Sequence, residues 1–459
     1  MGCEIREKCG VFGIFSKDQL VSQYIYHGLM ALQHRGQESA GIAVFDGKEI
    51  RVHKGMGLVS SVFGAQELQY LYGHVGIGHT RYSTTGASDI QNAQPFVFRG
   101  PKIGMAVALN GNILNYPELK EELEKKGHIF TTTTDTEVIA HLLARETKSD
   151  YFSAFKKIMK KLDGSYSLVV LTDKGEIIAA RDPKGFKPLC IGKTNSLSAV
   201  ASESSALDAL DIPFLREIKP GEVVILKEKI RAKRLVREKA YAHCMFEFVY
   251  FARPDTIFEG KTPLLVREEL GRTLARLYKV KGDVVVPIPD SGRSAAIGFS
   301  EESGIPLSEG LIKNRYIWRT FIMPYQKNRE SSVKLKLNPV KAVLKGKEVV
   351  VIDDSIVRGT TMKKIAKLLR DAGAKKIHLL ITCPPIIAPC YMGIDFPSYE
   401  ELIASGKTIE EIRKTIGVDT LNYMTIEGLV KSIGIDRKNL CMACLTGEYP
   451  TRKKPARGD

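Results

Sequence analysis

Two adjacent carboxylates, Asp353 and Asp354, directly follow four β-branched residues, 349–352, in the second half of the sequence. The residues after them include hydroxyl, glycine and basic positions, namely Ser355, Arg358, Gly359, Thr360 and Thr361. A buried parallel strand that ends in such a turn before a helix is typical of an anion site, because backbone N–H groups and the helix dipole face the ligand. The carboxylates suit a ligand that also carries sugar hydroxyls or Mg²⁺. The alternative is a strand end with two solvated acids and a helix cap.

This stretch resembles the motif with which type I phosphoribosyltransferases bind phosphoribosyl pyrophosphate. The resemblance implies that these seven residues bind that substrate and that Asp353 and Asp354 help to hold Mg²⁺. Residues 287–294 follow the preceding predicted strand, where this family binds pyrophosphate, which implies that Ser291 lies near the metal. The basic stretch that contains Lys313 and Arg315 resembles the family's closing loop, and the alternative is a solvated surface loop.

A second group of chemically active residues lies in the first third of the sequence. Cys9 precedes a short apolar run, and a cysteine at the start of a strand is unremarkable by itself. Polar clusters follow at residues 34–37, 78–84, 109–112 and 135–137. In order and spacing these clusters resemble the class II glutamine amidotransferases, which are N-terminal-nucleophile hydrolases.

This second resemblance implies a role for each polar cluster. Removal of residues 1–8 makes Cys9 the first residue, and its free α-amino group, with a reference pKa near 8, serves as base for its own thiol. The resemblance also implies that the Asn110 side chain and the Gly111 N–H form the oxyanion hole. Arg81, with Thr84 nearby, would bind the α-carboxylate of glutamine, and Asp135 its α-ammonium. Arg35 would be a further residue of the glutamine site. Cys3 is the rival nucleophile, but it lacks the Gly-Val-Phe-Gly-Ile sequence that follows Cys9.

The sequence has eight cysteines, and two of them, Cys441 and Cys444, form a C-x-x-C pair. In a reducing cytosol such a pair favours metal binding over a disulfide, and the alternative is an incidental pair. Spacing does not separate zinc from an iron–sulfur cluster, since both accept four thiolates. Cys244 and Cys390 lie in segments that resemble family members with a structural [4Fe–4S] cluster, which implies these four ligands. Cys190 and Cys383 are expected to be buried apolar residues.

The pattern of apolar residues changes near residue 230 and predicts two domains. Before residue 230, the sequence predicts short strands and helices that form a layered α+β domain, with Asn115 as the cap of one helix. The resemblance to N-terminal-nucleophile hydrolases implies that the layers follow the order αββα. After residue 230, Val- and Ile-rich strands alternate with helices and predict a parallel α/β sheet. We expect a propeptide at 1–8, a glutaminase domain at 9–235, and a phosphoribosyltransferase domain with a C-terminal cluster-binding segment at 236–459.

The 459 residues carry a net charge of +16, and three blocks hold nearly all of it. Residues 311–341, 227–239 and 451–459 have net charges of +7, +5 and +3. The largest block coincides with the stretch that resembles the closing loop over a phosphate-bearing substrate, so we do not expect nucleic acid as a partner. No apolar run is long enough to span a bilayer and the start lacks a signal-like apolar segment, so we expect a soluble cytoplasmic protein with no membrane partner.

Both halves together resemble one family, the amidophosphoribosyltransferases. This resemblance implies hydrolysis of glutamine, transfer of the ammonia to phosphoribosyl pyrophosphate, and release of phosphoribosylamine, pyrophosphate and glutamate as the first step of purine synthesis. It also implies one Mg²⁺ and one [4Fe–4S] cluster per subunit, inhibition by purine nucleotides, and a homo-oligomer, specifically a tetramer. Two alternatives stay open: a regulator that senses phosphoribosyl pyrophosphate, and a glutaminase that serves another acceptor.

Overall fold

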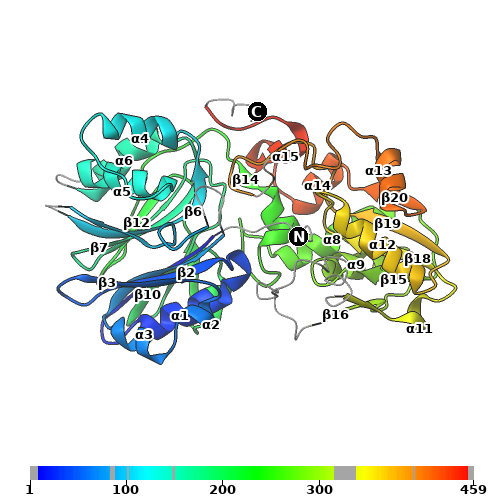
Figure 1. Ribbon diagram of the computed structural model, residues 1–459, viewed down its shortest axis with the longest axis horizontal. Helices are drawn as coiled ribbons and strands as arrows, with labels where there is room; N and C mark the ends of the chain where they lie inside the picture. The colour runs from blue at the N-terminus through cyan, green and yellow to red at the C-terminus, as the bar shows by residue number, and fades with distance from the viewer. Residues whose placement is uncertain are drawn as a thin grey trace.

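The computed structural model describes residues 9–82, 88–100, 103–146, 150–314, 337–394, 396 and 398–452. Two bodies lie side by side, one built from the first half of the chain and one from the second (Figure 1). Of the residues singled out in the sequence, 1–8, Thr84 and Arg315 lie outside the described part of the chain.

The first domain contains two stacked antiparallel sheets (Figure 1). The seven-stranded sheet has the order β11-β9-β10-β1-β4-β2-β3, with β1 (Gly10–Ser16), β2 (Ser39–Phe45), β3 (Ile50–Met56), β4 (Val75–Arg81), β9 (Cys190–Lys193), β10 (Leu197–Ala201) and β11 (Phe214–Glu217). The six-stranded sheet has the order β13-β12-β8-β7-β6-β5, with β5 (Phe96–Arg99), β6 (Gly104–Ile113), β7 (Gly164–Thr172), β8 (Ile177–Arg181), β12 (Glu222–Leu226) and β13 (Arg231–Arg234).

Helices cover the outer face of each sheet. On the seven-stranded sheet these are α1 (Ser22–Ala31), α2 (Val59–Val62), α3 (Ala65–Tyr70) and α7 (Ser205–Asp208), and on the six-stranded sheet α4 (Tyr116–Glu124), α5 (Asp135–Glu146) and α6 (Tyr151–Lys161). Between the sheets, apolar side chains such as Val11, Ile77 and Val169 form a core that is removed from water. Because both faces of both sheets are covered, the layers follow the expected αββα order, and the predicted fold class is confirmed.

Asn115 stands at the N-cap of α4 as predicted, but its side chain does not cap the helix. Its amide instead accepts a hydrogen bond from the Asp163 N–H at 2.9 Å and donates one to the Lys161 carbonyl at 2.9 Å. The side chain therefore joins the start of α4 to the turn between α6 and β7, because a tertiary partner competes with the local backbone for the same amide.

The second domain has a parallel sheet of four strands in the order β15-β18-β19-β20. These strands are β15 (Val284–Pro287), β18 (Glu348–Asp353), β19 (Lys376–Ile381) and β20 (Thr420–Tyr423). The helices around it include α8 (Pro263–Leu277), α9 (Gly292–Ser303), α11 (Lys341–Leu344), α12 (Thr360–Asp371), α13 (Ile409–Ile416) and α14 (Ile426–Ile433). A small antiparallel pair, β16 (Leu311–Lys313) and β17 (Leu337–Pro339), stands apart from the sheet.

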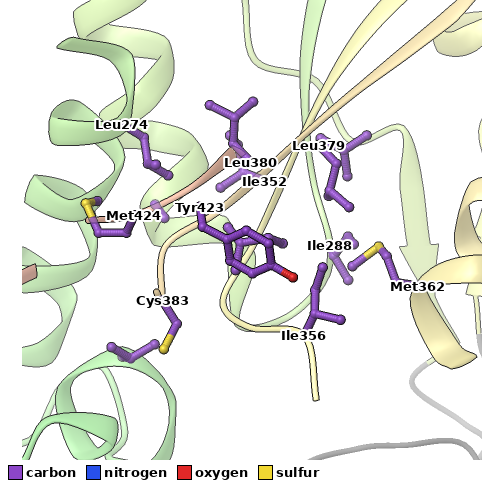
Figure 2. Packing of buried hydrophobic residues seen from close by; sticks show 14 of the residues in the cluster. Leu274, Ile288, Ile352, Ile356, Met362, Leu379, Leu380, Cys383, Tyr423 and Met424 are labelled. Atoms are coloured by element: carbon purple, nitrogen blue, oxygen red, sulfur yellow. The ribbon is translucent and has the colours of Figure 1, made fainter. Parts of the chain in front are cut away.

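Side chains on both faces of the parallel sheet are buried (Figure 2). Leu379 and Leu380 are neighbours on β19 and point to opposite faces, as successive strand residues must. Leu274 of α8 and Met362 of α12 belong to the same core, so helices from both sides contribute to it. This double cover explains why the strands read as continuous apolar runs in the sequence.

The chain returns at its C-terminal end to the place where the second domain began. The two-residue strand β14 (His243–Cys244) pairs in parallel with β21 (Leu440–Cys441), and α15 (Ala443–Thr446) follows. Hydrogen bonds tie the same region to the first domain, from Asn112 Nδ2 to the Tyr391 carbonyl and from Ser165 Oγ to the Met392 carbonyl, both at 2.9 Å. None of the helices in the described residues is long and apolar enough to cross a membrane.

Leu380→Ala tests the importance of the second core. Leu380 is fully buried, so we expect its truncation to lower the free energy of unfolding of this domain by about 3 kcal/mol through lost contacts and a cavity. Leu265→Ala on α8 is the matched control, because this leucine is 61% exposed and its loss is expected to cost less than about 0.5 kcal/mol. Denaturant unfolding measures both variants, and equal losses would contradict the assignment of Leu380 to the core.

Candidate active sites

Cys9 lies immediately before β1, the central strand of the seven-stranded sheet. Since Gly10 pairs with Thr80, Cys9 stands beside the end of β4, where Arg81 is the last strand residue. The side chain of Cys9 is 7% exposed, and its Sγ lies 3.7 Å from the Tyr82 carbonyl oxygen. The thiol is therefore held in a protected position at a strand end rather than inside the core between the sheets.

Asn110 comes from β6 of the other sheet. His79 on β4 ties the two sheets together, with Nε2 3.0 Å from the carbonyl oxygen of Leu109. Burial lowers the pKa of His79 to about 3, so the ring is neutral and donates this hydrogen bond. The amide of Asn110 is fully buried, and neither its oxygen nor its nitrogen has a hydrogen-bond partner among the described residues. A buried amide without a partner is costly, and a ligand that hydrogen bonds to it would remove that cost.

The residue after Asn110 must be small because the neighbouring strand passes very close. A Cβ atom on Gly111 would lie 2.0 Å from the carbonyl oxygen of Ser165 on β7, well inside contact distance. Glycine alone therefore keeps β6 against β7 at this point, and the close pairing fixes the position of the adjacent Asn110.

Arg81 and Asp135 provide opposite charges near this strand end. Asp135 begins α5, and its Oδ2 accepts a hydrogen bond from the Ile113 N–H at 2.9 Å. Burial raises the pKa of Asp135 to about 6, and the nearby Arg81 opposes part of that rise. A cation and a carboxylate within electrostatic reach of one another suit a zwitterionic ligand such as an amino acid. Thr84, expected beside Arg81, lies outside the described residues.

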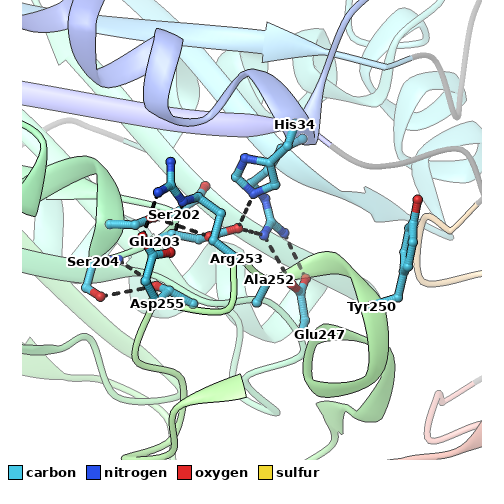
Figure 3. Close-up of polar contacts among 12 residues, drawn as sticks. His34, Ser202, Glu203, Ser204, Glu247, Tyr250, Ala252, Arg253 and Asp255 are labelled. Atoms are coloured by element: carbon cyan, nitrogen blue, oxygen red, sulfur yellow. Dashed lines mark hydrogen bonds and ion pairs between the residues drawn. The ribbon is translucent and has the colours of Figure 1, made fainter. Parts of the chain in front are cut away.

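Arg35 is also brought to this site, but carboxylates already occupy its guanidinium group. Its Nε donates to the Cys9 carbonyl at 3.4 Å, while Nη1 and Nη2 pair with Glu203 and Glu247. Figure 3 labels the two carboxylates, Glu203 and Glu247, and marks hydrogen bonds and ion pairs among the residues drawn with dashed lines. Arg35 thus contacts the backbone of Cys9 and links it to a residue of the second domain.

A second strand-end site lies in the second domain. Asp353 is the last residue of β18 and Asp354 follows it, and both are buried. Burial and the charge of Asp354 raise the pKa of Asp353 well above its usual range. Hydroxyl groups of Ser291 and Ser355 hydrogen bond to Asp354 and favour its ionised form against burial. Two neighbouring buried carboxylates call for a cation or for hydroxyl donors, which is what the sequence predicted for this position.

Close backbone approach brings Ser291 to these carboxylates. A Cβ on Gly292, at the start of α9, would lie 2.5 Å from the Ile352 carbonyl oxygen. Lys313 on β16 reaches the same turn, with Nζ 2.8 Å from Oδ2 of Asp290. The structure therefore gathers Ser291 and Lys313 around the end of β18, whereas Arg315 lies outside the described residues.

The turn between β18 and α12 adopts the shape that its glycine allows. Gly359 caps α12 with φ +74°, a left-handed conformation, and a Cβ there would lie 2.3 Å from Cδ1 of Ile403. Thr360 and Thr361 then open the helix with their N–H groups at its positive end. The guanidinium of Arg358, expected to bind the ligand, forms an ion pair with Glu401.

Buried thiols gather where β14 pairs with β21. Cys244 and Cys441 are direct partners in that pair, and both Cys441 and Cys444 are close enough to Cys390 for its charge to raise their pKa values, on top of the larger effect of burial. Four thiols within electrostatic reach are the donor set that an iron–sulfur cluster or a zinc ion needs. In the described ranges no three Cys, His, Asp or Glu side chains are arranged around a single metal ion. Cys190 and Cys383 are buried, as expected.

Sequence reasoning missed the buried charges that surround these sites. Glu203, Glu247 and Arg267 were not singled out, and His79 was quoted without a role. Glu247 carried a usable signal, because it is a lone carboxylate within the aromatic and apolar run 246–251. A charge inside such a run is expected to be paired when it is buried.

Comparison with known proteins agrees with this geometry. The family model described as a glutamine amidotransferase domain matches residues 79–209, and that of a phosphoribosyl transferase domain matches residues 262–389. The fold and its two strand-end sites therefore define a glutamine amidotransferase joined to a phosphoribosyltransferase.

Relatives that align with the whole chain give a narrower result. Amidophosphoribosyltransferase of Methanocaldococcus jannaschii is 54% identical over 96% of this chain and 98% of its own length. The amidophosphoribosyltransferase of Bacillus subtilis is 46% identical over 97% of this chain and 95% of its own length. A solved structure of glutamine phosphoribosylpyrophosphate amidotransferase from B. subtilis, complexed with ADP and GMP, matches with a TM-score of 0.90 and 45% identity over 96% of this chain and 97% of that one.

The chain belongs to the amidophosphoribosyltransferase family. Membership confirms the enzyme class and the function predicted from the sequence.

Gly359→Ala tests the close contact in the β18–α12 turn. Gly406 has nearly the same φ, +73° against +74°, but open space where a Cβ would stand, so Gly406→Ala is the matched control. We expect Gly406→Ala to cost about 1 kcal/mol of stability from the backbone conformation alone. Gly359→Ala should cost more, because the side chain of Ile403 must also move. Thermal unfolding of the two variants measures the difference, and equal costs would contradict the contact.

Proposed function

We propose that this enzyme hydrolyses glutamine at Cys9 and uses the ammonia to displace pyrophosphate from phosphoribosyl pyrophosphate. The products are glutamate, 5-phosphoribosylamine and pyrophosphate, the first step of purine synthesis. The observation that carries the proposal is that one chain holds two sets of buried polar groups: the Asn110 amide, which has no hydrogen-bond partner among the described residues, and the neighbouring carboxylates Asp353 and Asp354 at the end of β18.

In the glutaminase half, Cys9 Sγ attacks the amide carbon of glutamine after removal of residues 1–8. The freed α-amino group takes the thiol proton and passes it to the leaving ammonia, and water then hydrolyses the thioester to glutamate. Asn110 and the Gly111 N–H donate hydrogen bonds to the oxyanion. Arg81 with Thr84 binds the α-carboxylate of glutamine, and the ionised form of Asp135 binds its α-ammonium.

In the phosphoribosyltransferase half, ammonia attacks C1 of the ribose and the bond to pyrophosphate breaks. Asp353 and Asp354 accept hydrogen bonds from the ribose hydroxyls, and with Ser291 they would hold Mg²⁺. Ser355, Gly359, Thr360 and Thr361 bind the 5-phosphate at the start of α12, joined by Arg358 once it leaves Glu401. Lys313 and Arg315 stabilise the negative charge of departing pyrophosphate. When bound, Mg²⁺ would neutralise part of the pyrophosphate charge.

We also propose a domain boundary at residue 235, a homo-oligomer, and binding of purine nucleotides. The boundary is supported by β13, which ends at Arg234 in the first sheet, and by β14, which pairs with β21 of the second half. The nucleotide proposal draws on the B. subtilis relative, which was solved with ADP and GMP. The tetramer remains a prediction.

Asn110→Ala tests the glutaminase assignment. Loss of the oxyanion donor is expected to lower kcat for glutamine-dependent pyrophosphate release about 100-fold. The reaction driven by added ammonia should continue, because it does not use Cys9. Intact mass on the same sample is expected to lack residues 1–8.

The matched control for this variant is Asn195→Ala, since Asn195 is exposed in a turn far from Cys9 in the sequence. It should leave both reactions unchanged. Active enzyme that retains residues 1–8, or full glutamine-dependent activity of Asn110→Ala, would contradict the mechanism.

For the cysteines we propose a structural [4Fe–4S] cluster held by Cys244, Cys390, Cys441 and Cys444. Support comes from the number of these thiols, from the burial of Cys244, Cys441 and Cys444 beside the partly exposed Cys390, and from their mutual electrostatic influence. When bound, the cluster would join the C-terminal segment to β14 by four iron–thiolate bonds and take no part in the reaction.

Iron and sulfide analysis tests the cluster and its ligands. We expect the purified enzyme to be brown with broad absorption near 400 nm, and Cys444→Ala to lose iron. Cys383→Ala is the matched control, because Cys383 is a buried thiol near Cys444 that we assign to the core. Stoichiometric zinc without iron, or equal iron loss in both variants, would overturn the assignment.

A further inference from the structure

A cluster of buried charges lies where the two domains meet, beside Cys9 (Figure 3). Arg35 pairs with Glu203 and Glu247, and Lys187 Nζ lies 3.6 Å from Oε1 of Glu247. All four side chains are at most 2% exposed. Glu247 belongs to the second domain, whereas the other three residues belong to the first.

Arg35, Glu203 and Glu247 are ionised despite their burial. Burial disfavours the charged form of Arg35, but Glu247 and Glu203 outweigh it and raise its pKa above the usual range. Burial by itself would raise the pKa of Glu247, but the positive charges of Arg35 and Lys187 outweigh burial and lower this pKa. The buried charge of Glu247 is therefore stable only while Arg35 and Lys187 of the first domain are present.

Arg35 connects this cluster to the proposed nucleophile. Its Nη1 and Nη2 donate to the two carboxylate oxygens of Glu247 at 3.1 and 2.8 Å, and its Nε donates to the carbonyl oxygen of Cys9 at 3.4 Å. A two-point contact fixes the plane of a guanidinium group. The contact with Glu247 therefore sets the direction of Arg35 Nε, and this nitrogen in turn holds the carbonyl group of Cys9.

The segment that carries Glu247 is itself held firmly. It forms a π-helix, Glu247–Phe251, an uncommon element that occurs often at functional sites. The guanidinium of the buried Arg267 on α8 donates to the carbonyls of Phe248, Tyr250 and Ala252 at 2.7 to 2.9 Å. The carboxylate of Glu247 thus extends from a braced element of the second domain into the glutamine site.

We propose that Glu247 is a positioning residue for Cys9: through Arg35, the second domain orients the nucleophile of the first. Productive glutamine hydrolysis then requires the docked arrangement of the two domains. This inference rests on the proposed role of Cys9, and it assigns Arg35 to orienting the nucleophile rather than to binding glutamine.

Glu247→Gln tests the proposal, because the amide keeps the shape of the side chain but gives up one of its two acceptor oxygens. We expect kcat for glutamine hydrolysis to fall about 100-fold, as misplacement of a reacting group typically does. The KM for glutamine should change little, and the reaction with added ammonia should persist because the second domain remains folded.

Glu259→Gln is the matched control. Glu259 is also a carboxylate of the second domain that pairs with an arginine of the first, Arg181 at 2.6 Å, but it has no contact with Cys9 among the described residues. It should leave both reactions unchanged. If Glu247→Gln fails to fold, Glu247→Gln/Lys187→Met removes one charge of each sign and keeps the cluster neutral, and the same kcat loss is expected.

Three outcomes would overturn the inference: unchanged kcat in folded Glu247→Gln, equal loss in Glu259→Gln, or a raised KM with unchanged kcat. The last outcome would return Arg35 to glutamine binding. Cys9→Ala separates this inference from the proposed function. If Cys9→Ala still hydrolyses glutamine, the nucleophile is wrong; if it is inactive while Glu247→Gln is fully active, only the role of Glu247 fails.

Discussion

Buried ion pairs among Arg35, Glu203 and Glu247 join the two domains of this enzyme. A charge taken out of water is stable only when its partner is correctly placed, so breaking such a pair costs far more than forming it gains. The two domains therefore cannot slide past one another without leaving an unpaired buried charge. The position of Cys9, whose backbone Arg35 contacts, depends on this arrangement.

Both sites also share a simpler principle, although their sheets are of opposite kinds. In the first domain, Cys9 stands immediately before β1, Asn110 lies within β6 of the other sheet, and His79 connects the two sheets next to Asn110. In the second, parallel strands end at one edge, where Asp353 and Asp354 stand beside Ser291. Strand ends free polar groups from the ladder while the sheet holds them rigidly, which suits both chemistries.

Sequence patterns predicted the layered first domain, the parallel second sheet and the residues at each strand end. These succeeded because apolar periodicity and turn residues are local signals. The partners of Arg35 and the side-chain bonds of Asn115 escaped prediction, because each depends on residues distant in the chain. No local pattern reveals that Glu247 meets Arg35 across 212 positions. The ion pair between Arg358 and Glu401 was not predicted for the same reason.

The pairing of β14 with β21 sets an order of events during synthesis. Its partners Cys244 and Cys441 are 197 positions apart, and Cys444 follows still later. On the ribosome the first domain emerges and folds while these last cysteines are not yet made. The thiols that meet at this pair therefore cannot come together until the chain has been made as far as Cys444. The contact between β14 and β21 therefore closes after the first domain has folded.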